Sequence, residues 1–286
     1  MTRVLRLLAR AALAAVACAA AARASADSEF LPEIGVRLQA ARYLPSEVDL
    51  VHEGWIGANA GLARFGRTTA FLAADVETIL GSERREFEAN QANYHLELGA
   101  RRALSRDRAL TLFLHHVSRH AQDRDKPEAV DWNLLGVRFE APFPSEFKVP
   151  GRVAFGFGHT TQHSLIGYEW ELTGQALADL VTRRFGSVYG AAAFRLVSAD
   201  PEAPFERRGF LDFQAEGGAR FRRNGRMIEV FLALDHRNDV LIAEPLTETR
   251  ALIGFRIRVG RRHFAAPEDP RPRPAVEEKP LSPYRE

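Results

Sequence analysis

Apolar and polar residues alternate at a period of two along most of the chain, and this pattern limits the fold more than any other feature. Within residues 92–102 the two sets of alternate positions are Tyr94, Leu96, Leu98 and Ala100 against Asn93, His95, Glu97 and Arg101. Side chains at alternate positions of a β-strand lie on opposite faces. We therefore expect strands with one apolar face and one face that carries charges of both signs.

About twelve segments share this alternation, and each is close to the roughly 9–11 residues that a tilted membrane-spanning strand needs. We expect them at residues 33–43, 53–64, 67–79, 92–103, 108–118, 132–140, 151–161, 166–178, 185–197, 209–222, 226–236 and 248–260. The pattern is poorest in 67–79, where Phe71 shares a face with Asp75 and Glu77. The sequence thus predicts an all-β fold, an antiparallel up-and-down transmembrane β-barrel.

The connections between these segments alternate in length. Short turns are expected at residues 65–67, 105–107 and 223–225, and the last contains Asn-Gly, a strong hairpin signal. Longer polar connections are expected at residues 44–52, 80–91, 119–131, 198–208 and 237–247. Short turns at one end and long loops at the other are typical of bacterial outer-membrane barrels and predict that both termini lie in the periplasm. The turn at 141–150 is longer than this pattern requires.

Residues 1–26 have the features of a cleaved signal peptide. Arg3, Arg6 and Arg10 form a basic region, residues 7–22 are mostly apolar, and Ala24-Ser25-Ala26 is a small-residue cleavage site. A signal of this kind predicts export, here to the outer membrane of a Gram-negative bacterium. We expect residues 27–264 to form the barrel. Residues 265–286 are rich in proline and charge, which predicts a disordered periplasmic tail.

Composition excludes some classes of function. The only cysteine, Cys18, lies in the leader, so the mature chain would have no disulfide and no thiol chemistry. The formal net charge is +2, and loss of the four leader arginines would leave about −2, which gives no argument for nucleic-acid binding. No apolar run after the leader is long enough for a membrane-spanning helix.

Alternation alone does not decide which face of a strand meets water. A soluble periplasmic β-barrel that binds a ligand would turn the apolar face inward. The even strand number and the alternating loop lengths favour the membrane barrel, as do aromatic residues near strand ends, namely Tyr94, Tyr168 and Trp170. The membrane interpretation requires the faces of Leu96, Phe155 and Phe255 to point outward.

The charged face of a membrane barrel would line its lumen. The expected lumen-lining residues are Glu97, Arg101, Arg138, Glu140, Arg152, Glu169, Glu171, Arg195, Glu216, Arg220, Glu229, Arg256 and Arg258. Interleaved Arg and Glu either fill a barrel of this size with ion pairs or line a narrow porin-like channel. This hypothesis describes a channel or structural surface barrel that has no cofactor, with outer-membrane lipid, lipopolysaccharide and the barrel-assembly machinery as partners.

An alternative hypothesis is a lipid hydrolase. His116, Ser118 and His120 share one face, and that face points outward if the alternation of the preceding leucines continues. A neutral His activates a Ser hydroxyl for attack on an ester when a third group orients the ring. The candidates for that group are Asp123, Asp125 and Glu128 in the adjoining loop.

Two resemblances accompany these residues. His116-x-Ser118 resembles the His-x-Ser of lipid A deacylases, which are small outer-membrane barrels, although those enzymes have Asn where this chain has Arg119. Residues 226–257, together with His116-x-Ser118-x-His120 and residues 133–136, resemble an uncharacterised bacterial outer-membrane family, a domain of unknown function. This second resemblance implies a barrel and no particular activity.

A metal site is not expected. His116 and His120 invite partners such as His159 and His163. A zinc site needs three or four ligands that converge on one point. The sequence places these histidines on two separate strands and gives no reason for them to converge.

Overall fold

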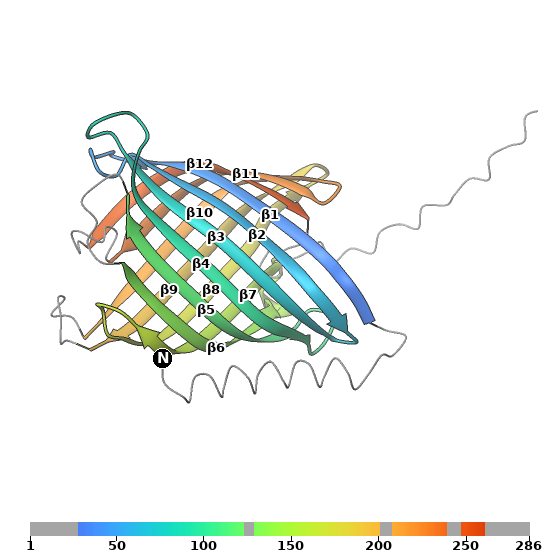
Figure 1. Cartoon of the computed structure of the whole chain (residues 1–286). Coiled ribbons are helices and arrows are strands. Elements are labelled where there is room, and N and C mark those ends of the chain that lie inside the picture. Colours follow the sequence, from blue (N-terminus) through green and yellow to red (C-terminus); the bar gives the residue numbers. More distant parts are fainter. Residues whose placement is uncertain (1–27, 123–128, 201–207, 239–246, 261–286) are drawn as a thin grey trace, which may run out of the picture.

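The chain folds into a closed antiparallel β-barrel of twelve strands, as a computed structural model shows (Figure 1). The structure describes residues 28–122, 129–200, 208–238 and 247–260. The strands are β1 Ser28–Leu44, β2 His52–Phe65, β3 Thr68–Gly81, β4 Glu88–Ala103, β5 Ala109–Ala121, β6 Val130–Pro142, β7 Gly151–His163, β8 Tyr168–Arg183, β9 Gly186–Ala199, β10 Gly209–Arg223, β11 Arg226–Arg237 and β12 Glu248–Gly260. Each expected segment overlaps one of these strands, and the predicted fold class is confirmed.

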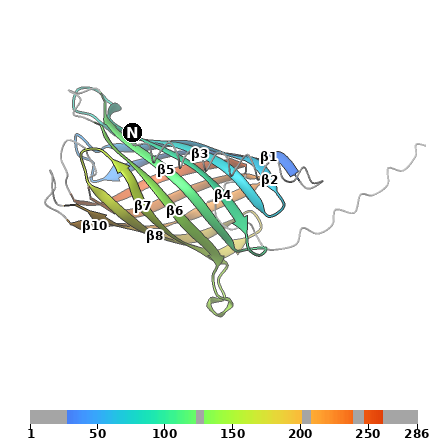
Figure 2. The ribbon, with the colours of Figure 1, turned by 60° about the horizontal axis from the view of Figure 1, so that its bottom comes forward.

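The strands follow one another around the barrel in chain order, with a common tilt that Figure 2 shows clearly. The barrel closes where Gly35–Leu44 of β1 pairs with Ala251–Gly260 of β12. Closure gives every strand two neighbours and leaves no open sheet edge. The signal peptide expected at 1–26 and the tail expected at 265–286 lie outside the described residues.

The apolar faces point away from the barrel interior. Leu96 is 46% exposed, Phe155 51% and Phe255 48%. Exposed apolar side chains on all twelve strands make an outer surface far larger than a soluble protein leaves in water. The outward direction required for a membrane barrel is therefore confirmed, and the soluble barrel with an inward apolar face is excluded. Within the described ranges, no helix is long and apolar enough to cross a membrane.

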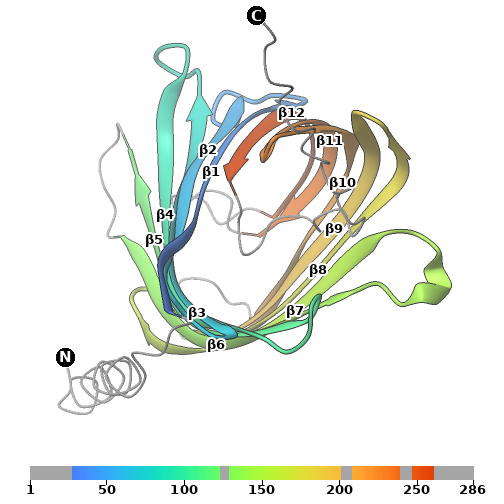
Figure 3. The same cartoon turned by 90° about the vertical axis from the view of Figure 1, so that its right-hand side faces the viewer.

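The connections define two ends of the barrel. Those at 66–67, 104–108, 143–150, 184–185 and 224–225 lie at one end, which we call the short-turn end. The opposite end, the long-loop end, holds the remaining connections, of which only 164–167 is short. Asn224 and Gly225 have φ of 49° and 71°, the left-handed values that a two-residue hairpin needs. The long turn expected at 141–150 is present, contains η1 (Ser145–Phe147) and stands off the barrel in Figure 3, which faces the short-turn end.

One expected face is wrong at the start of β8. A β-bulge lies between Tyr168 and Trp170, so the alternation shifts by one residue there. Tyr168 points inward, is 2% exposed and packs on Trp132, so it is not part of an outer aromatic girdle. Glu169 is exposed and accepts a hydrogen bond from Ser198 Oγ, so it does not line the lumen as expected.

The direction of the apolar face can be tested at Leu98, which is 51% exposed in the middle of the outer face of β4. Leu98→Arg should weaken folding into phospholipid vesicles by about 2–4 kcal/mol, because the charge would have to enter lipid. Urea titration followed by tryptophan fluorescence measures this change. Gln175→Arg adds the same charge to a lumen-facing position of β8 and should cost much less. Equal losses in the two variants would contradict the assigned faces.

Candidate functional site

The outer face of β5 changes character along the strand. Leu110, Leu112 and Leu114 are exposed apolar residues, and the next positions on the same face are His116, Ser118 and His120. These three side chains are half-buried. Because β5 ends at Ala121 beside a long connection, the polar group lies near the long-loop end, outside the barrel and next to the apolar band.

Two short hydrogen bonds organise this outer group. Ser118 Oγ lies 2.6 Å from His120 Nε2, and His116 Nδ1 lies 2.8 Å from Asn133 Oδ1. Asn133 comes from β6, where the antiparallel register places it directly opposite His116. Ser118 thus has an imidazole two residues away on each side, and among the described residues His116 is the one of the two that is hydrogen-bonded to a side chain of a neighbouring strand. We call these four residues the outer polar cluster.

Neighbouring strands extend the outer polar cluster. Asn133 Nδ2 donates to Gln162 Oε1 of β7 over 3.4 Å, and Thr161 Oγ1 donates to the Asn133 carbonyl over 3.2 Å. The rings of Tyr94 and His120 meet edge to face with centroids 5.6 Å apart. Contacts from β7 therefore hold Asn133, which in turn holds His116, while Tyr94 of β4 packs on His120.

The chemistry of the outer polar cluster follows from Asn133. An amide oxygen only accepts hydrogen bonds, so His116 Nδ1 carries the proton when Oδ1 faces it. In a neutral ring Nε2 then keeps its lone pair, as a general base requires. A Ser hydroxyl beside an oriented imidazole is the arrangement of serine hydrolases.

The orienting residue differs from the one that the sequence suggested. Asp123, Asp125 and Glu128 lie outside the described residues, and the group that contacts His116 is Asn133. Sequence reasoning missed this role because it depends on the pairing register of β5 with β6. Among the described residues, no group of three or more His, Cys, Asp or Glu is placed to hold a metal ion.

The lumen contains most of the expected charged residues. Ten of them line two adjoining cavities of about 310 and 460 Å³, namely Arg138, Glu140, Arg152, Glu171, Arg195, Glu216, Arg220, Glu229, Arg256 and Arg258. Glu97 and Arg101 face the same interior and pair with Arg138 and Glu140, at 2.9 and 3.3 Å. The two cavities share four lining residues, Arg138, Gln175, Ala193 and Gln214, so they meet inside the barrel.

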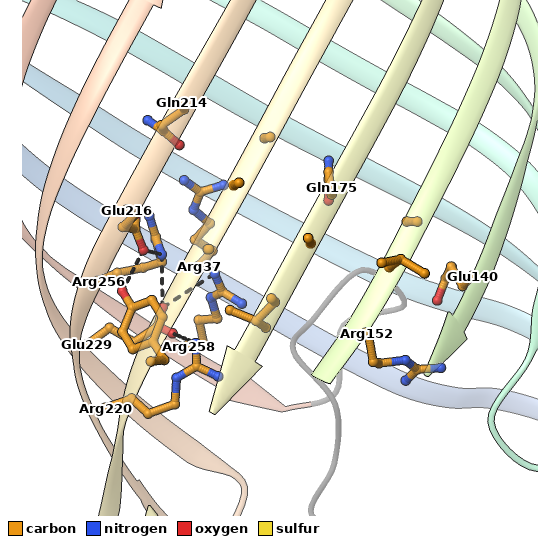
Figure 4. A pocket seen from close by; sticks show the side chains of 18 of the residues that line it. Arg37, Glu140, Arg152, Gln175, Gln214, Glu216, Arg220, Glu229, Arg256 and Arg258 are labelled. Carbon is orange, nitrogen blue, oxygen red and sulfur yellow. Dashed lines mark hydrogen bonds and ion pairs between the residues drawn. The ribbon is translucent and has the colours of Figure 1, made fainter. Parts of the chain in front are cut away.

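A network around Glu229 fills one wall of the lumen near the short-turn end (Figure 4). Glu229 lies 3.0 Å from Arg256, 3.2 Å from Arg220 and 3.4 Å from Arg258. Glu216 adds a second carboxylate, 2.9 Å from Arg256. Glu229 and Arg220 have side chains that are only 1% exposed, so these charges are balanced by one another and not by bulk water.

A second network lies toward the long-loop end and was not expected from the sequence. Arg237 of β11 contacts Glu53 of β2 at 2.8 Å, Glu77 of β3 at 2.5 Å and Asp235 at 2.5 Å. Tyr43 Oη donates to Glu53 over 2.9 Å. Arg237 therefore joins strands on the two sides of the β12–β1 pair.

Comparisons with known proteins find remote structural neighbours. No protein-family model matches the chain, and no curated protein matches it. Outer membrane phospholipase A from Escherichia coli is 9% identical with a TM-score of 0.49, and the match covers 80% of this chain and 97% of that one. The translocator domain of autotransporter NalP from Neisseria meningitidis is 11% identical with a TM-score of 0.37, over 90% and 97%. Pseudomonas putida OprB is 6% identical with a TM-score of 0.38, over 82% and 94%.

The lumen network can be tested at Glu229. Glu229→Gln should destabilise the barrel by about 3–5 kcal/mol, because the buried guanidinium groups of Arg220 and Arg256 would lose their shared anion. Glu29→Gln is the matched control, since Glu29 pairs with Arg64 at 3.0 Å but is 55% exposed; it should change stability by about 0–1 kcal/mol. Thermal unfolding in detergent, read from the mobility shift of the folded barrel on gels, compares the two. Equal losses of stability in the two variants would show that the buried network around Glu229 contributes little to the stability of the barrel.

Proposed function

We propose that this chain is an outer-membrane β-barrel that hydrolyses acyl esters of membrane lipids at its outer surface, with Ser118 as nucleophile and His116 as base. The observation that carries the proposal is the 2.8 Å contact between His116 Nδ1 and Asn133 Oδ1. It orients the His116 ring two residues from Ser118 on the same outer face of β5.

The proposed reaction has two halves. Ser118 Oγ attacks the carbonyl carbon of the ester while its proton passes to His116 Nε2. The ester C–O bond then breaks, and His116 gives the proton to the leaving alcohol oxygen. Water next attacks the acyl group on Ser118, His116 takes a proton from that water and returns one to Ser118 Oγ, and a fatty acid leaves.

The proposed steps require one change from the resting contacts, because Ser118 Oγ now lies 2.6 Å from His120 Nε2. Ser118 and His116 are two residues apart on one strand face, about 6.7 Å between Cα atoms. The hydroxyl now contacts His120, so a change of Ser118 rotamer would bring Oγ toward His116. Catalytic hydrogen bonds often tighten only when substrate is bound.

The substrate class follows from the surroundings. Leu114, Leu135 and Phe157 are exposed on the outer face just below the outer polar cluster, at 44%, 50% and 49%. An acyl chain lying in the bilayer would contact them while its ester linkage reached the level of Ser118. Lipids of the leaflet at the long-loop end, phospholipid or lipopolysaccharide, are therefore the proposed substrates and partners.

Purified barrel in mixed micelles should release fatty acid from phospholipid or lipopolysaccharide. Ser118→Ala should lower the rate at least about 10³-fold, because the nucleophile is lost. His116→Asn should lower it about 10²–10⁴-fold, the usual contribution of a general base. Titration of released fatty acid measures both rates.

Two further variants separate the roles of the neighbours. Asn133→Asp preserves an acceptor for His116 Nδ1 and should retain most of the activity, whereas Asn133→Ala should not. His120→Phe keeps a ring at that position and should retain activity as well. Full activity in His116→Asn with loss in His120→Phe would reassign the base to His120. Unchanged release in Ser118→Ala would remove the proposed nucleophile.

A second candidate function, a narrow channel, is favoured by the two adjoining cavities of about 310 and 460 Å³ in the lumen. The ion pairs around Glu229 and Arg237 leave little free charge to select cations or anions. We therefore expect small conductance steps with weak ion selectivity in planar bilayers. Arg237→Ala removes a long side chain from the lumen and should raise the unit conductance. The absence of steps from folded wild-type and variant protein would count against a channel.

A further inference from the structure

Exposed basic side chains gather at the short-turn end of the barrel. Nine of them belong to the described residues: Arg67, Arg102, Arg106, Arg108, Lys148, Arg183, Arg184, Arg223 and Arg226. Every one of the five connections at that end, or a strand end beside it, supplies at least one. The exposed acidic residues of the same end are three, Glu29, Asp107 and Glu146. We call the nine residues the basic collar.

The long-loop end differs in charge. Its exposed charged residues within the described ranges are Arg42, Arg84, Arg85 and Arg208 against Glu47, Glu83, Glu86, Glu169 and Asp200. These charges nearly balance, whereas basic residues outnumber acidic ones threefold at the short-turn end. The excess of positive charge is therefore a property of one end of the barrel and not of its surface as a whole.

Three side chains of the basic collar lie on strands at the edge of the apolar band. Arg102 follows the outward column of Leu96 and Leu98 on β4, and Arg223 follows Phe221 on β10. Arg226 precedes Ile228 on the same outer face of β11. In each column the last outward residue before the turn is Arg, the position from which a long basic side chain reaches a lipid headgroup.

Exposed apolar residues accompany the basic collar at the turns. Phe65 precedes Gly66-Arg67, Phe147 precedes Lys148, and Arg184 lies over the ring of the next residue, Phe185, at 5.1 Å. Phe185 is 70% exposed and Phe147 64%. An apolar side chain beside a basic one suits the boundary between acyl chains and phosphates.

Ion pairing distinguishes the basic collar from its neighbour Arg64. Arg64 contacts Glu29 at 3.0 Å and Glu33 at 3.9 Å. Within the described residues, no carboxylate lies within ion-pairing distance of the nine collar residues; Arg67 and Arg183 contact only backbone carbonyls, of Leu104 and Thr182. The collar charges are thus directed to the surroundings of the barrel.

We infer that the basic collar binds the phosphate groups of anionic phospholipids in the leaflet at the short-turn end. Nine basic residues in a ring around the barrel match a surface of anionic headgroups, and each contributes on the order of a fivefold preference over neutral lipid. The inference concerns the opposite end from the outer polar cluster and does not depend on hydrolysis. It assigns the barrel a shell of bound anionic lipid that holds its depth and orientation in the membrane.

The test uses the full barrel carrying Ser118→Ala, so that no lipid is consumed, in nanodiscs of equal parts phosphatidylcholine and phosphatidylglycerol. Native mass spectrometry counts the lipids that stay bound. We expect at least a fivefold excess of phosphatidylglycerol, which 0.5 M NaCl should reduce. The collar variant Arg102→Gln, Arg183→Gln, Arg223→Gln and Arg226→Gln should lose most of this excess.

The matched control removes the same charge from the other end, by Arg42→Gln, Arg84→Gln, Arg85→Gln and Arg208→Gln. It should keep the excess of phosphatidylglycerol. The mobility shift on gels verifies that both variants are folded, and single collar substitutions replace the fourfold variant if it does not fold. Equal lipid binding by the two fourfold variants, or no excess in the starting protein, overturns the inference. Retention of lipopolysaccharide in place of phosphatidylglycerol, when both are offered, overturns the choice of phospholipid.

Discussion

Backbone hydrogen bonding in a medium without water is the constraint on which the whole barrel depends. Lipid offers no partner for an N–H or C=O group, so every strand must pair on both sides. The pairing of β1 with β12 meets this condition for the two strands that would otherwise be edges. Closure also fixes a cylinder with an inside and an outside, and the period of two then assigns each residue to one of them.

The same alternation produces two unlike chemical environments. The outside is apolar over most of its height and polar at β5–β6, where His116, Ser118 and Asn133 lie at the edge of the apolar band. The inside carries acidic and basic side chains that pair with one another, and those of Glu229 and Arg220 are almost fully buried. A candidate reaction site on the outside and a cross-linked interior can therefore coexist without sharing a residue.

Much of the barrel was predictable from the sequence, since period two and turn residues are local signals. All twelve strands and the Asn224-Gly225 hairpin were found in this way. Tyr168 and Glu169 were assigned to the wrong faces because a bulge shifts alternation without a residue that marks it. The contacts of Asn133 and Arg237 depend on inter-strand register and on the diameter of the closed barrel, which no single segment encodes.

Several side chains inside the barrel connect strands across the pairing of β1 with β12, which we call the β12–β1 seam. These contacts oppose a lateral opening of the barrel at that pairing. Arg256 of β12 donates to Gln39 of β1 over 2.7 Å, and Arg237 reaches past both strands from β11 to β2 and β3. Parting the seam would break buried charged contacts from the inner side as well as the backbone ladder. Side-chain contacts inside the barrel thus hold β1 against β12. We therefore do not expect a lateral opening between these two strands.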